Sequence, residues 1–441
     1  MPGFSCKGER RDMNERRQKR TVAPAGNING SLTPPGDKSI SHRYAMLAAL
    51  AEGQSSLENF SSAADCASTL QCLRQVGVAV TQEGDRVEVA GGPFSRPREA
   101  LNCGNSGSTM RMLAGIMAAQ SFACQMTGDD SLRKRPMARI VEPLRRMGAQ
   151  ISSSDGARPP LLVHGRPLHA IDYKLPVASA QVKSCVLFAG LLAQGTTAVE
   201  EPLRTRDHSE LALRAFGATV ERHDMRVTIQ GGQQLRAIKA SVPGDISSAA
   251  FFLCAAALFQ GSNLVVDNLL LNPTRSAILD VLAQLGLEIR FLHVAERNGE
   301  VVGSIHVRGG KLRGAIVRGA TSALLIDELP VLAAIAPYSE SGVVIADAQE
   351  LRVKESDRIA AVASNLRAMG ATVEEKEDGM VIPGKQQLHG ATINPHGDHR
   401  IAMAFSVAAL RATGETVIDG SECVAISYPA FFDTLDKLLE R

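Results

Sequence analysis

The stretch PGDKSISHRYAMLAAL, residues 35–50, is the part of the sequence that decides the fold. A glycine and several polar residues precede a run of small apolar residues, which predicts a buried helix with Asp37 or Ser39 as its N-cap. The first turn of a helix has free N–H groups and a partial positive charge, to which Lys38 and Arg43 add two full charges. Such a helix end is suited to bind a phosphate or a carboxylate. Taken alone, a capped helix with solvated cations explains the stretch equally well.

The same kind of helix opening occurs six times along the chain. The six candidate helices are apolar on nearly all sides, which predicts that they are buried. Their polar openings are Asp37-Lys38-Ser39, Asn105 to Ser108 with Arg111, Ser179-Ala180-Gln181 with Lys183, Asp245 to Ser248, Asp327-Glu328 and Asp398-His399-Arg400. If the helices pack in parallel, their positive ends converge on one cleft for a ligand with several negative charges. Six independent surface caps are the alternative, but caps rarely combine Lys, Arg and Gln.

A second repeated pattern is a helix that ends at a glycine and is followed by a β-branched stretch. It occurs at Gly77, Gly148, Gly217, Gly286 and Gly370, with successive gaps of 71, 69, 69 and 84 residues. A glycine in this place predicts a left-handed residue after the helix, and the Val or Ile beyond it predicts a strand. A sixth helix, residues 430–440, ends the chain without a following strand. The near-constant spacing indicates an internal repeat of one supersecondary unit.

Length and composition limit the class of protein. The 441 residues exceed what one core usually serves, so two domains are expected. The net charge of +2 argues against general nucleic-acid binding. The eight cysteines are scattered without the spacing of a zinc site and fit reduced thiols in the cytosol. No run of 18 apolar residues is present, so no transmembrane helix is predicted.

The six units divide into two domains of three. The chain has two candidate crossing points between them, GSLTPPG at 30–36 and ASVPG at 240–244, and an N-terminal strand near 26–33 would complete the C-terminal half. The predicted boundaries are 1–20 for a disordered basic tail, 37–242 for one domain, and 21–36 with 243–441 for the other. The tail has no apolar segment, so a secretory signal is not predicted, and a nucleic-acid arm is the less favoured alternative.

Two basic loops lie between the helices, SLRKRPMAR at 131–139 and ELRVKESDR at 350–358. In the second, Lys354, Glu355 and Arg358 are predicted to share one helical face. Glu355 could transfer protons there, or it could form only a surface ion pair worth a few tenths of a kcal/mol. Neither a phosphate-binding Walker loop, a GxSxG elbow nor an HExxH helix is present.

Eight motifs make the chain resemble the 5-enolpyruvylshikimate-3-phosphate synthase family. In order they are PGDKSISHR, GNSGSTMR, KRPM, SAQVKS, TRDHSE, IDELP, RVKESDR and DHRIAMAF, and the resemblance extends from Gly30 to Arg441. It implies an α/β (α+β) fold, the two-domain inverse α/β barrel, with three βαβαββ repeats in each domain, buried helices and outer sheets. It also implies transfer of the enolpyruvyl group of phosphoenolpyruvate to the 5-hydroxyl of shikimate 3-phosphate, through a tetrahedral intermediate in the interdomain cleft, with release of phosphate.

The resemblance further implies roles for single residues. Lys38 and Glu355 would form the proton-transfer pair, and Asp327 would help to deprotonate the attacking hydroxyl. Contacts to shikimate 3-phosphate are implied for Lys38, Ser39, Arg43, Ser179, Gln181, Arg206, Asp327 and Lys354. Contacts to phosphoenolpyruvate are implied for Lys38, Asn105, Gly107, Arg135, Gln181, Arg358, His399 and Arg400. No metal site and no cofactor are implied.

The resemblance also bears on partners and inhibitors. A cytoplasmic monomer without nucleic-acid or membrane partners is expected. Some members of the family resist glyphosate because alanine replaces the glycine at position 107, which this chain retains, so glyphosate is expected to bind. The chain departs from many members in having SAQ instead of SSQ and in lacking a lysine in the stretch 425–429. Both departures resemble the divergent bacterial branch of the family.

Two other functions are the alternatives to this one. The first is the sister transferase that acts on UDP-N-acetylglucosamine, which is expected to use a cysteine in the loop before an Arg-Pro pair. That loop here reads GDDSLRKRP and contains no cysteine. The second is a phosphate-binding or RNA-end-processing module, which the near-neutral charge and the missing nucleotide loop disfavour.

Overall fold

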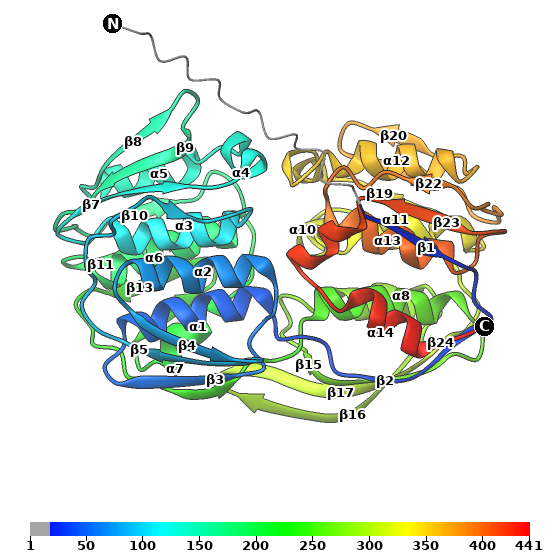
Figure 1. Cartoon of the computed structure of the whole chain (residues 1–441), viewed down its shortest axis with the longest axis horizontal. Coiled ribbons are helices and arrows are strands. Elements are labelled where there is room, and N and C mark those ends of the chain that lie inside the picture. Colours follow the sequence, from blue (N-terminus) through cyan, green and yellow to red (C-terminus); the bar gives the residue numbers. More distant parts are fainter. Residues whose placement is uncertain (1–17) are drawn as a thin grey trace, which may run out of the picture.

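The computed structural model describes residues 18–441 and shows two lobes side by side (Figure 1). Their buried side chains form two hydrophobic clusters, here called the N-terminal core and the C-terminal core. The N-terminal core contains α1 (Lys38–Leu50), α3 (Gly107–Met117) and α6 (Ala180–Leu191). The C-terminal core contains α8 (Ile246–Leu258), α11 (Leu329–Ile335) and α13 (His399–Ala409). Every residue of α8, α11 and α13 is buried, as the all-round apolar sequence predicts.

A second set of helices alternates with the buried ones and buries only one side. This set is α2 (Ala64–Gln75), α5 (Ala138–Arg146), α7 (His208–Ala215), α9 (Ala277–Gln284), α12 (Arg358–Ala368) and α14 (Phe431–Leu438). The shorter helical segments are α4 (Asp130–Lys134), α10 (Ala320–Leu324), η1 (Ala336–Tyr338), η2 (Gln349–Val353) and η3 (Ser421–Ile426). The glycines predicted to follow five of these helices have φ between +87° and +104°, which confirms them as left-handed C′ residues.

Six small sheets surround the buried helices. Around the N-terminal core they run β14 (Lys239–Ser241)-β3 (Gln54–Glu58)-β5 (Arg86–Ala90)-β4 (Ala79–Glu83), β6 (Leu101–Asn102)-β7 (Ala123–Thr127)-β9 (Arg158–His164)-β8 (Gln150–Ser154) and β10 (Asp172–Lys174)-β11 (Thr196–Glu200)-β13 (Arg226–Gln230)-β12 (Val220–His223). Around the C-terminal core they run β16 (Glu288–Arg297)-β17 (Glu300–Arg308)-β15 (Asn263–Leu270)-β2 (Asn27–Leu32)-β24 (Leu439–Glu440), β18 (Ala315–Val317)-β19 (Val343–Ile345)-β21 (Gly379–Ile382)-β20 (Glu374–Lys376) and β1 (Lys19–Val22)-β23 (Thr416–Asp419)-β22 (Thr392–Ile393). Each sheet contains one parallel pair, and one strand of that pair is the first strand after a buried helix in the chain.

The sixth sheet shows how the ends of the chain complete the repeat. In the other sheets a hairpin strand pairs antiparallel with the strand that follows the buried helix. After β23, the described residues form η3, α14 and β24 instead of such a hairpin. β1 takes that place and pairs antiparallel with β23. Two predicted boundaries, the end of the N-terminal tail and the end of the last helix, are therefore wrong. Lys19 and Arg20 belong to a strand and not to a disordered tail, whose residues 1–17 lie outside the described part. The last helix is followed by the short strand β24, which pairs with β2.

The two cores exchange one strand each. β2 precedes α1 of the N-terminal core, yet it pairs in parallel with β15 beside the C-terminal core. Conversely, β14 precedes α8 of the C-terminal core, yet it pairs in parallel with β3 beside the N-terminal core. The two crossing segments lie side by side, because Gly36 and Gly244 form an antiparallel bridge. A Cβ at Gly36 would come within 1.8 Å of the Asn59 carbonyl oxygen, so only glycine fits this crossing.

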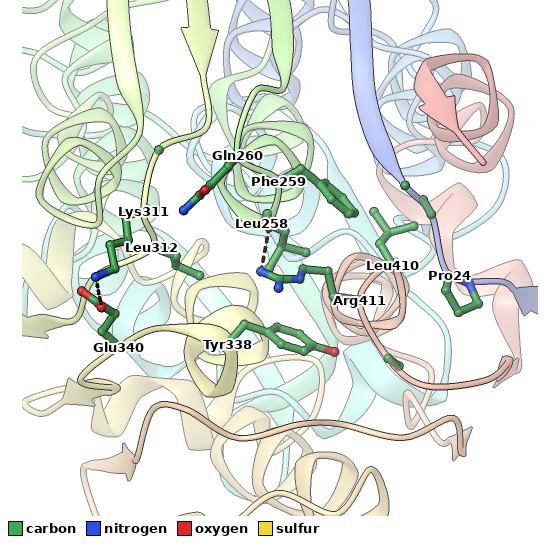
Figure 2. Close-up of a pocket in the computed structure, with 14 residues that line it drawn as sticks. Pro24, Leu258, Phe259, Gln260, Lys311, Leu312, Tyr338, Glu340, Leu410 and Arg411 are labelled. Atoms are coloured by element: carbon green, nitrogen blue, oxygen red, sulfur yellow. Dashed lines mark hydrogen bonds and ion pairs between the residues drawn. The ribbon is translucent and has the colours of Figure 1, made fainter.

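The C-terminal ends of α8, α11 and α13 face a cavity of about 630 Å³ (Figure 2). Arg411 follows α13 and donates a hydrogen bond of 2.9 Å to the carbonyl oxygen of Leu258, at the end of α8. Its guanidinium also lies over the Tyr338 ring, 5.6 Å from the ring centroid. Lys311 and Glu340 form an ion pair at the edge of the same cavity (Figure 2). Within residues 18–441, no helix has both the length and the apolar character required to cross a membrane.

Candidate active site

The N-terminal ends of the buried helices are built alike. Five of them are capped by a side-chain oxygen that accepts a hydrogen bond from a backbone N–H in the first turn, namely by Asp37, Ser106, Ser179, Asp245 and Asp398. The sixth helix, α11, begins after Asp327 and Glu328 without a side-chain cap. The polar openings predicted from sequence are thus the caps themselves, while the cations beside them are free to make other contacts.

Ion pairs join the helix ends of the two cores. Arg206, which precedes α7, donates to Asp327 at 2.6 Å, and Arg135, which follows α4, approaches Glu355 at 3.5 Å. A third pair, Arg139 with Glu350 at 3.0 Å, lies farther out and is about half exposed. These contacts link residues 121 to 220 positions apart in the sequence. Predicted site residues from opposite ends of the chain therefore lie in one place between the cores.

Lys38 is the first residue of α1 and lies close to three other predicted site residues, namely Glu355, His399 and Arg400. Its Nζ contacts Asp65 of α2 at 2.8 Å. Burial and Arg400 act to lower the pKa of Lys38, but Asp65 and Glu355 outweigh them, so that the pKa lies above its ordinary value. Burial and the Lys38 charge lower the pKa of His399 to about 3. Lys38 is thus protonated at neutral pH, whereas the imidazole of His399 beside it is neutral.

His399, the first residue of α13, is 1% exposed. Neither of its ring nitrogens has a hydrogen-bond partner among residues 18–441. Because a buried polar group without a partner costs free energy, such a side chain points to a ligand. The Nε atom of Arg135 is likewise buried and unpartnered within that range. Both residues, His399 and Arg135, belong to the predicted phosphoenolpyruvate contacts.

Glu355 is held between two guanidinium groups. Arg358, the first residue of α12, donates to it at 2.7 Å, and Arg135 approaches it from the other core at 3.5 Å. Burial would raise the pKa of Glu355, but Arg358 and Arg135 outweigh it and hold the pKa well below its ordinary value. Glu355 is therefore ionised in the free protein. It does not share a helical face with Lys354, because Asp357 caps α12 and starts the helix only at Arg358.

Asp327 has cations on several sides. Its carboxylate pairs with Arg206 at 2.6 Å, with Arg358 at 3.4 Å and with Arg400 at 3.8 Å. Burial would raise the pKa of Asp327, but Arg400 and Arg206 lower it far below the usual range. Lys354 also faces this carboxylate, although burial outweighs Asp327 and leaves the pKa of Lys354 below its ordinary value. Asp327 is thus a second ionised carboxylate.

The start of α3 supplies a further group of predicted residues. Asn105 accepts from Arg135 at 2.7 Å and donates to Asp129 at 2.7 Å. A Cβ at Gly107 would come within 2.7 Å of the Arg111 guanidinium and 3.4 Å of that of Arg135. The glycine therefore lets two guanidinium groups approach the helix backbone closely.

The start of α6 lies next to α3. Gln181 accepts from Arg111 at 2.6 Å and donates to Ser108 at 2.9 Å. Ser179 caps α6. Arg43 on α1 donates to Ser209 at 2.7 Å and to Ser184 at 2.8 Å, and it also donates to the carbonyl of Ser39. Ser39 and Ser179 are thus placed by their helix ends, whereas Arg43 is fixed mainly by neighbouring serines.

Sequence reasoning missed one residue of this site and left the contact of a second residue unpredicted. Asp65, the partner of Lys38, sits in the first turn of α2, where an acidic residue is common and gives no distinctive signal. Arg111 lies in the recognised GNSGSTMR motif, but only the structure shows its contact with Gln181.

Comparisons with known proteins show the family of the chain. The family model of EPSP synthase (3-phosphoshikimate 1-carboxyvinyltransferase) matches residues 22–435. A 3-phosphoshikimate 1-carboxyvinyltransferase from Koribacter versatilis is 62% identical over 423 residues, which cover 95% of this chain and 99% of the relative. One from Bacillus cereus (strain G9842) is 46% identical over 426 residues, which cover 96% of this chain and 99% of the relative.

Solved structures support the same relationship. EPSP synthase from Acinetobacter baumannii superposes with a TM-score of 0.86 at 41% identity, over 96% of this chain and 98% of that one. The enolpyruvyl transferase NikO from Streptomyces tendae shares the fold, with a TM-score of 0.78 at 18% identity over 95% of this chain and 96% of that one. The predicted fold class, the inverse α/β barrel, is confirmed. The chain belongs to the EPSP synthase family.

Proposed function

We propose that this protein transfers the enolpyruvyl group of phosphoenolpyruvate to the 5-hydroxyl of shikimate 3-phosphate and releases phosphate, a step of the shikimate pathway to aromatic amino acids. The observation that carries the proposal is the buried group of cations contributed by both cores around Asp327, Glu355 and His399. Two anionic substrates repel each other, and an excess of fixed cations is required to hold them within reacting distance.

The charge states support a division of roles in the addition step. Asp327, an ionised acceptor, takes the proton of the 5-hydroxyl as its oxygen bonds to the central carbon of phosphoenolpyruvate. Lys38, which is protonated, delivers a proton to the methylene carbon, which becomes a methyl group. The product is a tetrahedral intermediate that still carries the phosphate.

In the elimination step a proton leaves the methyl group again. Glu355 takes a proton from the methyl group as the carbon–oxygen bond to phosphate breaks and the double bond forms again. The proton held by Asp327 leaves with the phosphate, and that on Glu355 returns to Lys38. Atoms and protons balance without a further reactant, and no metal or organic cofactor enters the proposed scheme.

The remaining residues are assigned to binding. Arg135, Arg358, Arg400, His399, Asn105 and Gly107 would hold phosphoenolpyruvate, since guanidinium groups bind carboxylates and phosphates in a bidentate manner. Ser39, Arg43, Ser179, Arg206 and Lys354 would hold shikimate 3-phosphate. Gln181 is assigned to both substrates because it lies between the ends of α3 and α6.

An assay of phosphate release tests the proposal directly. Purified protein is mixed with phosphoenolpyruvate and either shikimate 3-phosphate or UDP-N-acetylglucosamine, and the carboxyvinyl product is identified by mass spectrometry. Release only with shikimate 3-phosphate is expected, since the family that matches favours this acceptor over the sister reaction. Release only with UDP-N-acetylglucosamine, or with neither, would contradict the proposal.

Several further properties belong to the same proposal. We assign one domain to residues 37–242 and the other to 21–36 with 243–441, supported by the two hydrophobic cores and the exchanged strands. A monomeric state belongs to the same proposal. Seven free, buried cysteines in the described part support a reducing, cytoplasmic setting. Glyphosate, which carries a carboxylate and a phosphonate, should compete for the cations near Gly107.

A further inference from the structure

Arg275 makes an unusual set of contacts at the boundary of the two cores. It lies between β15 and α9, and its side chain is 3% exposed. One terminal nitrogen donates to the Asp37 carboxylate at 3.0 Å, and the other donates to Asp245 at 3.2 Å and to Ser247 at 2.8 Å. Asp37 and Asp245 are the N-caps of α1 and α8. A single guanidinium therefore ties the N-terminal end of a helix in one core to that of a helix in the other.

These two caps follow directly on the segments where the chain crosses between the cores. The Asp37 N–H donates to the Pro243 carbonyl at 2.7 Å, and the Asp245 N–H donates to the Pro35 carbonyl at 2.8 Å. The bridge between Gly36 and Gly244 lies between these bonds. Backbone hydrogen bonds and the guanidinium thus fix the two crossings to each other at one point.

The loop that carries Arg275 is itself fixed to both cores. The Asn272 side chain accepts from the Thr274 N–H at 2.8 Å and donates to Asp207, next to α7, and to Glu300 of β17, each at 2.8 Å. His208 of α7 lies 2.6 Å from Glu300 through Nδ1 and 3.4 Å from Arg275 through Nε2. The position of the guanidinium is therefore set from several sides.

Short paths lead from Arg275 to the proposed chemistry. On one side, Asp37 is followed directly by Lys38. On the other, Ser247 donates to the Glu328 carboxylate, and Glu328 follows Asp327. Arg275 itself touches neither Lys38 nor Asp327. Any effect on catalysis must therefore act through the helix ends that hold these two groups.

Removing the guanidinium would leave two buried carboxylates facing each other across the crossings. Burial would raise the pKa of Asp37, but Arg275 and His208 lower it to about 2. Burial and the charge of Asp37 raise the pKa of Asp245. Without Arg275 the two charges repel, and the caps of α1 and α8 must separate or take up protons.

We infer that Arg275 is a positioning residue that fixes the N-terminal ends of α1 and α8 to each other, and thereby sets Lys38 and Asp327 at their working separation. The inference rests on the proposed function. Most of the cations that would hold the substrates come from other elements, so loss of Arg275 should lower kcat more than it raises either KM. A small displacement of reacting groups costs about 100-fold in rate.

The test compares Arg275→Gln and Arg275→Lys with Arg222→Gln. Arg222 is the matched control because it also bridges two buried carboxylates, Glu201 at 2.7 Å and Glu210 at 2.8 Å, but within the N-terminal core alone. For folded Arg275→Gln we expect kcat to fall about 100-fold, with each KM within about threefold of wild type. Arg275→Lys should restore part of kcat, and Arg222→Gln should lower the unfolding midpoint but keep kcat within about twofold.

Each outcome decides the inference. A folded Arg275→Gln enzyme with the kcat of the wild type overturns it, and so does an equal loss of kcat in Arg222→Gln. If Arg275→Gln does not fold, Arg275→Lys decides: a reduced kcat per folded molecule supports the inference, and an unchanged kcat overturns it. Wild-type turnover of shikimate 3-phosphate and phosphoenolpyruvate is measured first. Its absence would overturn the proposed function, whereas an active wild type with an equally active Arg275 variant would overturn only the role of Arg275.

Discussion

The two ends of α8, α11 and α13 carry opposite partial charges, and the protein treats them differently. At the N-terminal ends, positive dipoles are joined by Arg358 and Arg400, and carboxylates are placed among the cations. At the C-terminal ends, Arg411 donates to the carbonyl oxygen of Leu258, at the end of α8, beside the cavity of Figure 2. The N-terminal ends therefore gather positive charge, whereas at the C-terminal ends a cation neutralises the negative end of the dipole. The comparison teaches that basic residues at the N-terminal end of a helix indicate an anion-binding site, whereas basic residues at the C-terminal end only neutralise the helix dipole.

The largest expected effect is at the N-terminal ends, in Glu355→Gln. The amide keeps the shape of the side chain but cannot take the methyl proton, so kcat should fall about 1,000-fold while both substrates still bind. Steady-state kinetics and calorimetric binding measure this. Glu350→Gln is the control, because Glu350 lies on the same loop and also pairs with an arginine of the other core. An unchanged kcat in Glu355→Gln would remove this residue from the mechanism.

The next effect is on binding, in Arg135→Gln. Loss of a charged donor to the carboxylate or phosphate of phosphoenolpyruvate should raise its KM about 10- to 100-fold and change the KM for shikimate 3-phosphate much less. Arg133→Gln, an exposed neighbour on α4, should match the wild type. Equal changes of both KM values would show that Arg135 does not discriminate between the substrates.

A smaller effect is expected from Gly107→Ala. The added methyl group would come within 2.7 Å of the end of the Arg111 side chain, which must shift. We expect the KM for phosphoenolpyruvate and the inhibition constant for glyphosate to rise about three- to tenfold, because the disturbance is one methyl group against a flexible side chain. Gly92→Ala, which meets no atom within 4 Å, is the control. Wild-type protein that millimolar glyphosate does not inhibit would contradict the assignment of this pocket.

The smallest effect is at the opposite ends, in Arg411→Gln. Loss of the contact with the Tyr338 ring and of the hydrogen bond to Leu258 should lower the free energy of unfolding by about 1 kcal/mol, with kcat and both KM values unchanged. Urea unfolding and steady-state kinetics measure the two quantities. A fall in kcat comparable to that of Glu355→Gln would show that the two ends are not functionally distinct.

The sequence allowed much of the fold to be predicted, because its signals are local. Long runs of small apolar residues predicted the buried helices, and a glycine after five of the six one-sided helices predicted a left-handed residue. The strands β1 and β24 escaped prediction because they are short and pair with partners far along the chain. Pairing of this kind leaves no periodic pattern in the strand itself.

The residues of the candidate site were predicted through motifs, whereas the contacts between their side chains were not. Lys38, Glu355 and Asp327 stand in recognisable stretches, but the partner of Lys38, Asp65, does not. Arg275 and Asp37 lie 238 residues apart, and nothing near either residue indicates their contact. Local sequence gives the residues at helix ends, and only the packing of the cores shows which of them meet.

The central claim is that the N-terminal helix ends of both cores form one pocket for two neighbouring anions. A crystal structure of the protein with shikimate 3-phosphate and glyphosate tests it most directly. The account predicts density for both molecules between the cores, with their acidic groups against Lys38, Arg135, Lys354 and Arg400. Density at the Arg411 cavity instead, or anions held on separate faces of the molecule, would contradict it.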